Sequence, residues 1–306
     1  MHLTPGGAPD WCPDPRVLKV TVGGHCVQKE TRSPVSRGSR RYLICLDLLC
    51  LCIVSIPFLI CELGVVAPIH RGFFCDDTTI QFPVIHQETI SDTVLISVGI
   101  LITGVTIALG ECYRVSRQNN SKSRPRESYL AAVYCQLLPF LFGSALGQSI
   151  TNAAKLSAGR LRPNFLSVCQ PEGLNCTTGF IETYRCTGDA GAVTEARKSF
   201  YSGHASFSMY SMLYLTFYLQ VRLTWRGARL LRPLVQFVLI LVSLYTGFTR
   251  ISDYRHHPSD VVVGFLQGAL VAYWVAFHIS DLFRKKKSEY VTVPPRPESP
   301  ETFTNC

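Results

Sequence analysis

Six long apolar runs divide the chain, and each is long enough to form a membrane-spanning helix. A helix needs about 20 mostly apolar residues to cross the hydrocarbon region of a bilayer. The runs are apolar on every face, whereas helices of a soluble core are apolar along one stripe only. We therefore expect an all-α fold, a bundle of six transmembrane helices at residues 42–62, 92–112, 130–151, 204–221, 233–249 and 260–281.

Lys and Arg residues gather in short clusters beside these runs, and their positions predict how the chain is oriented in the membrane. Loops rich in Lys and Arg stay in the cytoplasm. With six spans, all four clusters fall on one side, so both termini are expected to be cytoplasmic. The loops at residues 63–91, 152–203 and 250–259 are then expected outside or in a lumen. The clusters are Arg37, Arg40 and Arg41; Arg114, Arg117, Lys122, Arg124 and Arg126; Arg222, Arg226, Arg229 and Arg232; and Arg284, Lys285, Lys286 and Lys287.

The composition agrees with an integral membrane protein. Of the 306 residues, 47% are hydrophobic and 17% are charged, whereas about 25% of the residues of soluble domains are charged. The formal net charge of +9 would suggest nucleic-acid binding in a soluble protein. Because the basic residues lie beside apolar runs, we interpret them as topology signals, and we expect the bilayer, not nucleic acid, as the partner.

The six runs lie in one block, residues 41–283, between two polar tails. Residues 1–40 are rich in Gly, Pro and Arg and lack the pattern of a cleavable signal peptide. Residues 284–306 begin with a basic run and continue with several prolines, without a core-forming pattern. We expect both tails to be disordered and cytoplasmic, and the sequence leaves a homo-oligomer open.

The predicted outer loops carry two features of an extracellular or lumenal segment. Asn175 begins an acceptor sequence for N-glycosylation, and we expect it to carry a glycan. A second acceptor sequence begins at Asn119, in a predicted cytoplasmic loop, and is expected to be unmodified. Four cysteines also lie in the outer loops, where disulfides persist, and the sequence leaves their three pairings open: Cys75, Cys169, Cys176 and Cys186.

Three polar clusters at the outer ends of predicted spans have a chemistry that suits a phosphate group. A phosphoryl group in transfer spreads negative charge over its oxygens, and cations stabilise that charge. Lys155, Arg162 and Arg250 supply three cations. Ser202 and Gly203 stand where a helix is expected to begin, and the free N–H groups of a helix start bind anions.

Two histidines in these clusters supply the remaining groups for phosphoryl transfer. A neutral imidazole can attack phosphorus, and a protonated one can give its proton to the leaving oxygen. His204 and His256 are the candidates. Asp260, four residues after His256, can accept a hydrogen bond from the ring and fix its tautomer. The neighbouring His257 also has a feasible spacing to Asp260, so spacing alone does not exclude it.

The three clusters resemble the signature of the type 2 phosphatidic acid phosphatase superfamily, which reads KxxxxxxRP, PSGH and SRxxxxxHxxxD. The segments around them, 159–163 and 199–206, are similar to those of animal lipid phosphate phosphatases, and 224–233 resembles their type 3 members. The resemblance extends from about residue 41 to about residue 283. Two positions depart from the broad signature: Tyr201 replaces a proline, and Thr249 replaces a serine but keeps the hydroxyl.

The resemblance implies a role for each candidate residue. His256 would form a phosphohistidine, and His204 would protonate the leaving lipid oxygen and later help to activate water. Lys155, Arg162, Ser202, Gly203 and Arg250 would bind the phosphate. Asp260 would be the third catalytic residue, which accepts a hydrogen bond from the ring of His256.

The resemblance also implies the substrates and the location. Neither a cofactor nor a metal is expected, since no His or carboxylate cluster has the spacing of a zinc or magnesium site. Substrates would be phosphatidate, lysophosphatidate, sphingosine 1-phosphate and ceramide 1-phosphate. The active site would be extracellular at the plasma membrane, or lumenal in an internal membrane. Three alternatives are a lipid phosphotransferase with the same histidines, a non-catalytic scaffold and a transporter.

Overall fold

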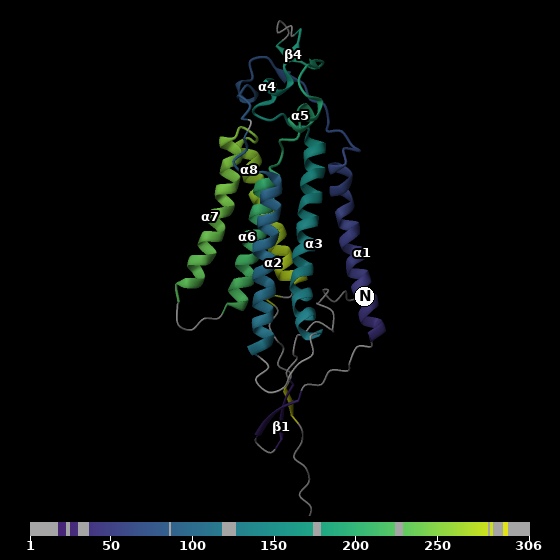
Figure 1. Cartoon of the computed structure of the whole chain (residues 1–306), viewed down its shortest axis with the longest axis vertical. Coiled ribbons are helices and arrows are strands. Elements are labelled where there is room, and N and C mark those ends of the chain that lie inside the picture. Colours follow the sequence, from purple (N-terminus) through teal and green to yellow (C-terminus); the bar gives the residue numbers. More distant parts are fainter. Residues whose placement is uncertain are drawn as a thin grey trace, which may run out of the picture.

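Six long helices dominate the described part of the computed structural model, and they run side by side along its long axis (Figure 1). They are α1 (Arg37–Glu62), α2 (Asp92–Arg117), α3 (Glu127–Ala158), α6 (Gly203–Arg222), α7 (Leu231–Ser252) and α8 (Pro258–Trp274), the last continued by a π-helical turn, Val275–Ile279. The structure describes residues 18–22, 25–29, 37–85, 87–117, 127–173, 179–223, 229–280, 282–283 and 290–292.

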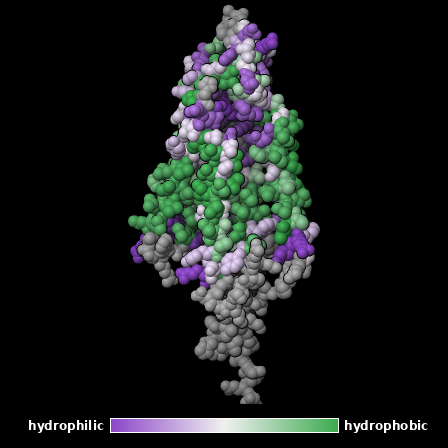
Figure 2. Space-filling view, in the orientation of Figure 1, coloured by the Kyte–Doolittle hydropathy of each residue, from purple (hydrophilic) through white to green (hydrophobic). Residues whose placement is uncertain are grey.

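Five of these helices are long and apolar enough to cross a membrane. Within the described ranges they are α1, α2, α3, α7 and α8. Figure 2 shows a broad hydrophobic band around the middle of the molecule, at the level of these helices, with hydrophilic residues gathered above it. The prediction of a mainly helical membrane protein is therefore confirmed. The predicted span at 204–221 forms α6, which is too polar to count among the five.

The polarity of α6 is explained by its central position. It packs against α2, α3, α7 and α8, so that much of its surface faces protein. Its tyrosine hydroxyls have partners in this interior: Tyr210 donates to the carbonyl of Phe140 at 2.7 Å, and Tyr218 donates to Glu111 Oε1 at 3.2 Å. Because buried polar groups are satisfied in this way, α6 does not need an apolar surface.

Two glycines bring α8 against the first turns of α6. A Cβ at Gly264 or Gly268, one turn apart on α8, would overlap the carbonyl oxygens of Ser202 and Ser206 respectively. Small residues at this spacing let two helices pack with their backbones close together. The start of α6 is also joined to α8 directly, since the Ser202 N–H donates to the carbonyl of Asp260 at 3.1 Å. This packing places the second and third polar clusters side by side.

A small cap of short elements covers one end of the helices (Figure 1). Buried residues from several of its segments, among them Phe73, Ile80, Phe165 and Ile181, form a core of their own. The cap consists of β3 (Phe73–Phe74) paired with β5 (Phe180–Ile181), β4 (Pro171–Glu172) paired with β6 (Arg185–Cys186), the 3₁₀ turn Thr78–Ile80, α4 (Phe165–Cys169) and α5 (Ala190–Glu195).

A disulfide between Cys169 and Cys186 ties α4 to β6 within this cap. It selects one of the pairings that the sequence left open. Cys75 is disulfide-bonded as well. The other two predictions for this region, a glycan on Asn175 and a disulfide at Cys176, lie outside the described residues.

Three strands from the two tails form a sheet, although both tails were predicted to be disordered. β1 (Leu18–Val22) pairs with β2 (His25–Lys29) in antiparallel fashion and with β7 (Tyr290–Thr292) in parallel. The parallel pairing joins the two ends of the chain, and no local pattern in the sequence reveals such a contact. The sheet lies beyond the helix ends opposite the cap (Figure 1).

Candidate active site

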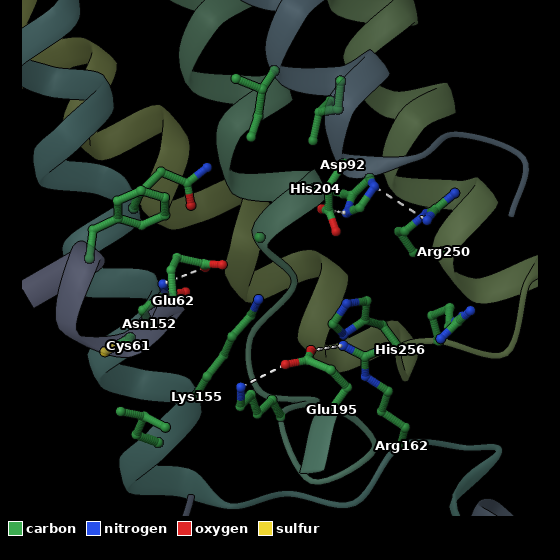
Figure 3. A pocket seen from close by; sticks show the side chains of 18 of the residues that line it. Cys61, Glu62, Asp92, Asn152, Lys155, Arg162, Glu195, His204, Arg250 and His256 are labelled. Carbon is green, nitrogen blue, oxygen red and sulfur yellow. Dashed lines mark hydrogen bonds and ion pairs between the residues drawn. The ribbon is translucent and has the colours of Figure 1, made fainter. Parts of the chain in front are cut away.

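A cavity of about 310 Å³ lies among the helix ends that face the cap, and six of the eight predicted catalytic and phosphate-binding residues line it (Figure 3). Ser202 and Asp260 are the two exceptions; both are fully buried behind its wall. The lining residues come from α3, the loop after it, the start of α6, the end of α7 and the turn before α8. They are Lys155, Arg162, Gly203, His204, Arg250 and His256.

His256 is held through one ring nitrogen. Its Nδ1 lies 2.7 Å from the carbonyl oxygen of Ser199 and therefore carries the proton of that hydrogen bond, which leaves the lone pair on Nε2. Burial lowers the pKa of His256 well below its usual range, and the positive charges of Arg162 and Lys155 lower it further. The ring is consequently neutral at neutral pH, as a nucleophile must be.

The predicted hydrogen bond between His256 and Asp260 is not formed, because His256 Nδ1 and Asp260 Oδ2 lie 4.0 Å apart. Asp260 is the third residue of α8, and its carboxylate reaches back to the N–H of His257 at 3.1 Å, as in a capping box. The same oxygen accepts a hydrogen bond from Ser199 Oγ at 2.6 Å. Asp260 therefore acts on His256 through Ser199, whose carbonyl holds the ring.

Two further contacts fix the buried carboxylate of Asp260. Arg160 Nη1 lies 2.5 Å from Oδ1, and His257 Nδ1 lies 3.2 Å from Oδ2. His257 is thus the histidine that contacts Asp260, but it does not line the cavity. The structure assigns the two adjacent histidines to different positions, His256 in the cavity wall and His257 beside the carboxylate.

His204 lies above His256 in the view of Figure 3, in the first turn of α6. Its Nε2 is 3.0 Å from the carbonyl oxygen of Ile90, and its Nδ1 is 3.4 Å from Asp92 Oδ1. Arg250 Nη1 is 3.3 Å from the same Nε2. Each ring nitrogen therefore has an acceptor within reach when it carries a proton, which suits a group that gives and takes protons.

The two arginines of the cavity, Arg162 and Arg250, are paired with carboxylates. Arg250 is almost completely buried and contacts Asp253 at 2.9 Å and Glu88 at 3.2 Å. Arg162 Nη2 lies 3.3 Å from Glu195. These contacts hold the guanidinium groups in place, and the buried positive charges remain available to a phosphate.

Glu195 keeps its negative charge in this setting. Burial raises its pKa, but the hydrogen bond from Lys198 and the positive charges of Arg162, Lys198 and Lys155 outweigh burial, and the net pKa is lowered. The Lys198 ammonium lies 2.6 Å from Glu195 Oε1. A charged Glu195 therefore stands beside Arg162 in the wall of the cavity.

The start of α6 faces the cavity at Gly203 rather than at Ser202. Ser202 is the N-cap residue, and its hydroxyl accepts a hydrogen bond from the Ala205 N–H at 3.4 Å. The hydroxyl and the N–H of Ser202 thus have partners inside the protein, which differs from the predicted phosphate contact. A Cβ at Gly203 would lie 3.4 Å from Lys155 Nζ, so the lysine extends across the helix start. The first N–H groups of a helix lack intrahelical partners and attract anions.

Comparisons with known proteins agree with this arrangement. The sequence pattern of the PAP2 superfamily matches residues 136–284. The phospholipid phosphatase 2 of Mus musculus is 46% identical over 261 residues, which cover 84% of this chain and 91% of the relative. The chain belongs to the lipid phosphate phosphatases of the PAP2 superfamily.

Other PAP2 relatives are similar to nearly the same extent. The phospholipid phosphatase 2 of Homo sapiens is 47% identical over 254 residues, 82% of this chain and 88% of the relative. The phospholipid phosphatase 1 of Rattus norvegicus is 42% identical over 253 residues, 80% and 87%. These names are those of types 2 and 1, and the resemblance to type 3 members stays a prediction. No solved structure matches the chain.

Several residues of this PAP2 site were missed by sequence reasoning. Glu62, Glu88, Asp92 and Glu195 line the cavity, and Ser199 holds the nucleophile candidate. The carboxylates lie outside the PAP2 signature, and each contacts a site residue that is distant in sequence, so no spacing reveals them: Glu62 contacts Asn152, Glu88 contacts Arg250, Asp92 contacts His204, and Glu195 contacts Arg162. Within the described ranges, no group of three or more His, Cys, Asp or Glu side chains could hold a metal ion.

Proposed function

We propose that this protein removes phosphate from lipid phosphate monoesters through a phosphohistidine on His256. The arrangement of the cavity carries the proposal. A neutral histidine and a second histidine with proton acceptors line one cavity, together with the buried cations Arg162 and Arg250. The substrates we propose are phosphatidate, lysophosphatidate, sphingosine 1-phosphate and ceramide 1-phosphate, the lipids that the PAP2 resemblance implies.

In the first step, Nε2 of His256 attacks the phosphorus, and the bond from phosphorus to the lipid oxygen breaks. His204 gives a proton to that oxygen, so that the lipid leaves as an alcohol. The proton on His256 Nδ1 stays hydrogen-bonded to the Ser199 carbonyl, which stabilises the positive charge that develops on the ring. In the second step, His204 takes a proton from water, the water oxygen attacks the phosphorus, and His256 is released.

The proposed phosphate site combines three positive charges with hydrogen-bond donors whose directions are fixed by the fold. Lys155, Arg162 and Arg250 neutralise the phosphate oxygens from three directions, and the N–H groups at Gly203 add donors from the start of α6. Ser202 supports this helix start from behind, as its N-cap. Because these groups are held before substrate binds, little reorganisation is needed during the reaction.

We also propose a six-span topology with both termini in the cytoplasm. Residues 41–283 form the catalytic domain between two cytoplasmic tails. Parallel pairing of β1 with β7 supports this topology, because strands from the two tails can pair only when both tails are on one side. An even number of spans is then required, and α6 is the sixth helix of sufficient length. The positive clusters favour a cytoplasmic location of both tails, and in this topology the cavity opens outside the cell or into a lumen.

The lipid part of a substrate can be accommodated beside α1. The cavity lining includes the apolar residues Phe58 on α1 and Leu95 and Ile96 on α2, which we call the apolar wall, beside polar residues such as Glu62. The window of α1 that would lie in the membrane has no buried residues, so this helix is at the periphery of the bundle. We propose that the acyl chain stays at this apolar wall while the phosphate reaches the histidines.

Phosphate release from purified protein tests the proposal. The panel of lipid phosphates is presented in mixed micelles, with and without an alcohol acceptor. We expect free phosphate from the wild type, none from His256→Ala, and wild-type activity from His278→Ala, which removes an exposed histidine on the last helix. Transfer of phosphate to the alcohol instead of to water would favour the phosphotransferase. An active His256→Ala would refute the proposed nucleophile.

A further inference from the structure

Three consecutive residues before α2 contact two residues of the proposed active site and Asp253, the carboxylate that is paired with Arg250. Glu88 contacts Arg250, Thr89 contacts Asp253, and the carbonyl of Ile90 contacts His204. We refer to Glu88, Thr89 and Ile90 as the strap. The predicted site contained no residue of the strap, because it belongs to a loop far from the three signature clusters.

Thr89 anchors the strap through two hydrogen bonds to one carboxylate. Its N–H donates to Asp253 Oδ2 at 3.0 Å, and its hydroxyl donates to Asp253 Oδ1 at 2.8 Å. Asp253 is 5% exposed and also accepts from Arg250 Nη2 at 2.9 Å. Hydrogen bonds to a buried charged group are stronger than those between neutral groups. Asp253 therefore fixes the strap and the Arg250 guanidinium relative to each other.

The residue after Thr89 determines how His204 is held. The Ile90 carbonyl lies 3.0 Å from His204 Nε2, and a carbonyl at this distance fixes the rotation of the ring about its bond to the backbone. The ring also contacts Arg250 Nη1 at 3.3 Å, through the same Nε2, and the mostly exposed carboxylate of Asp92 at 3.4 Å, through Nδ1. The backbone of the strap thus supplies the shortest of the three contacts of this ring.

We propose that Thr89 is a positioning residue, which through Asp253 holds the Ile90 carbonyl against His204 and so aligns the proton donor with the leaving oxygen. This rests on the proposed function, in which His204 protonates the lipid oxygen. A misaligned donor slows only those reactions whose leaving oxygen needs a proton. A phenolate of low pKa leaves without one, so its departure does not depend on His204. A loss of general structure would slow both kinds of reaction alike.

The test compares kcat/KM for a lipid phosphate with kcat/KM for an aryl phosphate whose phenol has a low pKa. This constant reports the first step alone, formation of the phosphohistidine. Thr89→Val keeps the shape and the backbone N–H of the residue but removes the hydroxyl. We expect kcat/KM to fall about tenfold for the lipid phosphate, as when one hydrogen bond to a buried charge is lost, and less than about twofold for the aryl phosphate.

Two further variants serve as controls. Thr89→Ser keeps the hydroxyl and should restore both constants to nearly the wild-type values. Thr79→Val removes a hydroxyl from the same loop, one that donates to Asp77 at 2.6 Å in an exposed position, and should change neither constant. Equal losses on both substrates in Thr89→Val, or no loss on either, would overturn the proposal. A wild type that releases no phosphate from any lipid phosphate would instead overturn the proposed function.

Discussion

Substitutions at Asp260 and Ser199 test how the nucleophile is held. In the structure the carboxylate reaches His256 only through Ser199, whose hydroxyl contacts Asp260 at 2.6 Å and whose carbonyl contacts His256 at 2.7 Å. Ser199→Ala removes the first contact but leaves the carbonyl in the chain. Asp260→Asn keeps the shape of the side chain and removes its charge.

The expected magnitudes follow from these contacts. A hydrogen bond to a buried charged group contributes about 1.5–3 kcal/mol, and about 1.4 kcal/mol corresponds to a tenfold change in rate or equilibrium. Ser199→Ala loses one such bond, so kcat/KM should fall about tenfold. Asp260→Asn weakens the contacts to Ser199, Arg160 and the His257 N–H together, and should lower kcat/KM by about 100-fold.

The assay measures kcat/KM on a lipid phosphate in mixed micelles, together with the burst of phosphohistidine. The double variant, Ser199→Ala with Asp260→Asn, should lower kcat/KM no further than Asp260→Asn alone, because both substitutions interrupt the same chain of contacts from Asp260 to His256. Ser157→Ala is the control, since its hydroxyl donates only to its own helix, to Ala153 at 2.8 Å. Wild-type activity in Ser199→Ala combined with a severe loss in Asp260→Asn would refute the indirect path, because Asp260 would then act on His256 directly.

Four other predictions concern metal, pH, topology and packing. Activity should survive EDTA, because three cations already neutralise the phosphate; loss on chelation and recovery with Mg²⁺ would contradict the mechanism. The lowered pKa of His256 keeps its ring neutral, so kcat/KM should fall on the acid side only well below pH 6.5; an acid limb at or above 6.5 would contradict this assignment. Asn175→Gln should remove a glycan and shift gel mobility, whereas Asn119→Gln should not; a glycan on Asn119 would invert the topology. Gly268→Ala should lower the free energy of unfolding by about 1–3 kcal/mol, since the added Cβ overlaps the α6 backbone. Gly104→Ala is the control: its Cβ has room beside Leu137, so the free energy of unfolding should not change. Thermal unfolding of both variants measures the difference.

The helices could be predicted from the sequence because lipid demands long apolar segments, a local property of the chain. Helix α6 was also predicted, at 204–221, but its serines and tyrosines face other helices and lower its hydropathy, so it is not among the five helices that are apolar enough to cross a membrane. The pairing of β1 with β7 could not be predicted, since the partners lie at opposite ends of the chain. The disulfide between Cys169 and Cys186 depends on how the cap folds, and spacing did not distinguish it from its alternatives.

The site was predictable where a signature fixes residue types and spacing. His204 and His256 line one cavity, as the PAP2 pattern implies. The partner of Asp260 was predicted wrongly, because spacing of four residues suggests a contact along a helix, whereas the helix begins only at Pro258. The backbone is extended at His257, the N-cap residue, and capping geometry directs the carboxylate to His257 and Ser199. The residues of the strap are more than a hundred residues away in sequence from the residues they contact. The spacing of residues within a motif therefore could not predict these contacts.

The glycine contacts between α6 and α8 divide the protein into a rigid part and an adjustable part. Because their backbones are in contact, we expect these two helices to move together, with His204 in the first turn of α6 and His256 just before the start of α8. Helix α1 packs mainly against α3 and stands outside this pair. Substitutions on the face of α1 near Phe58 can therefore change which lipid tails are accepted without moving the histidines, so that tail selectivity and chemistry can evolve separately.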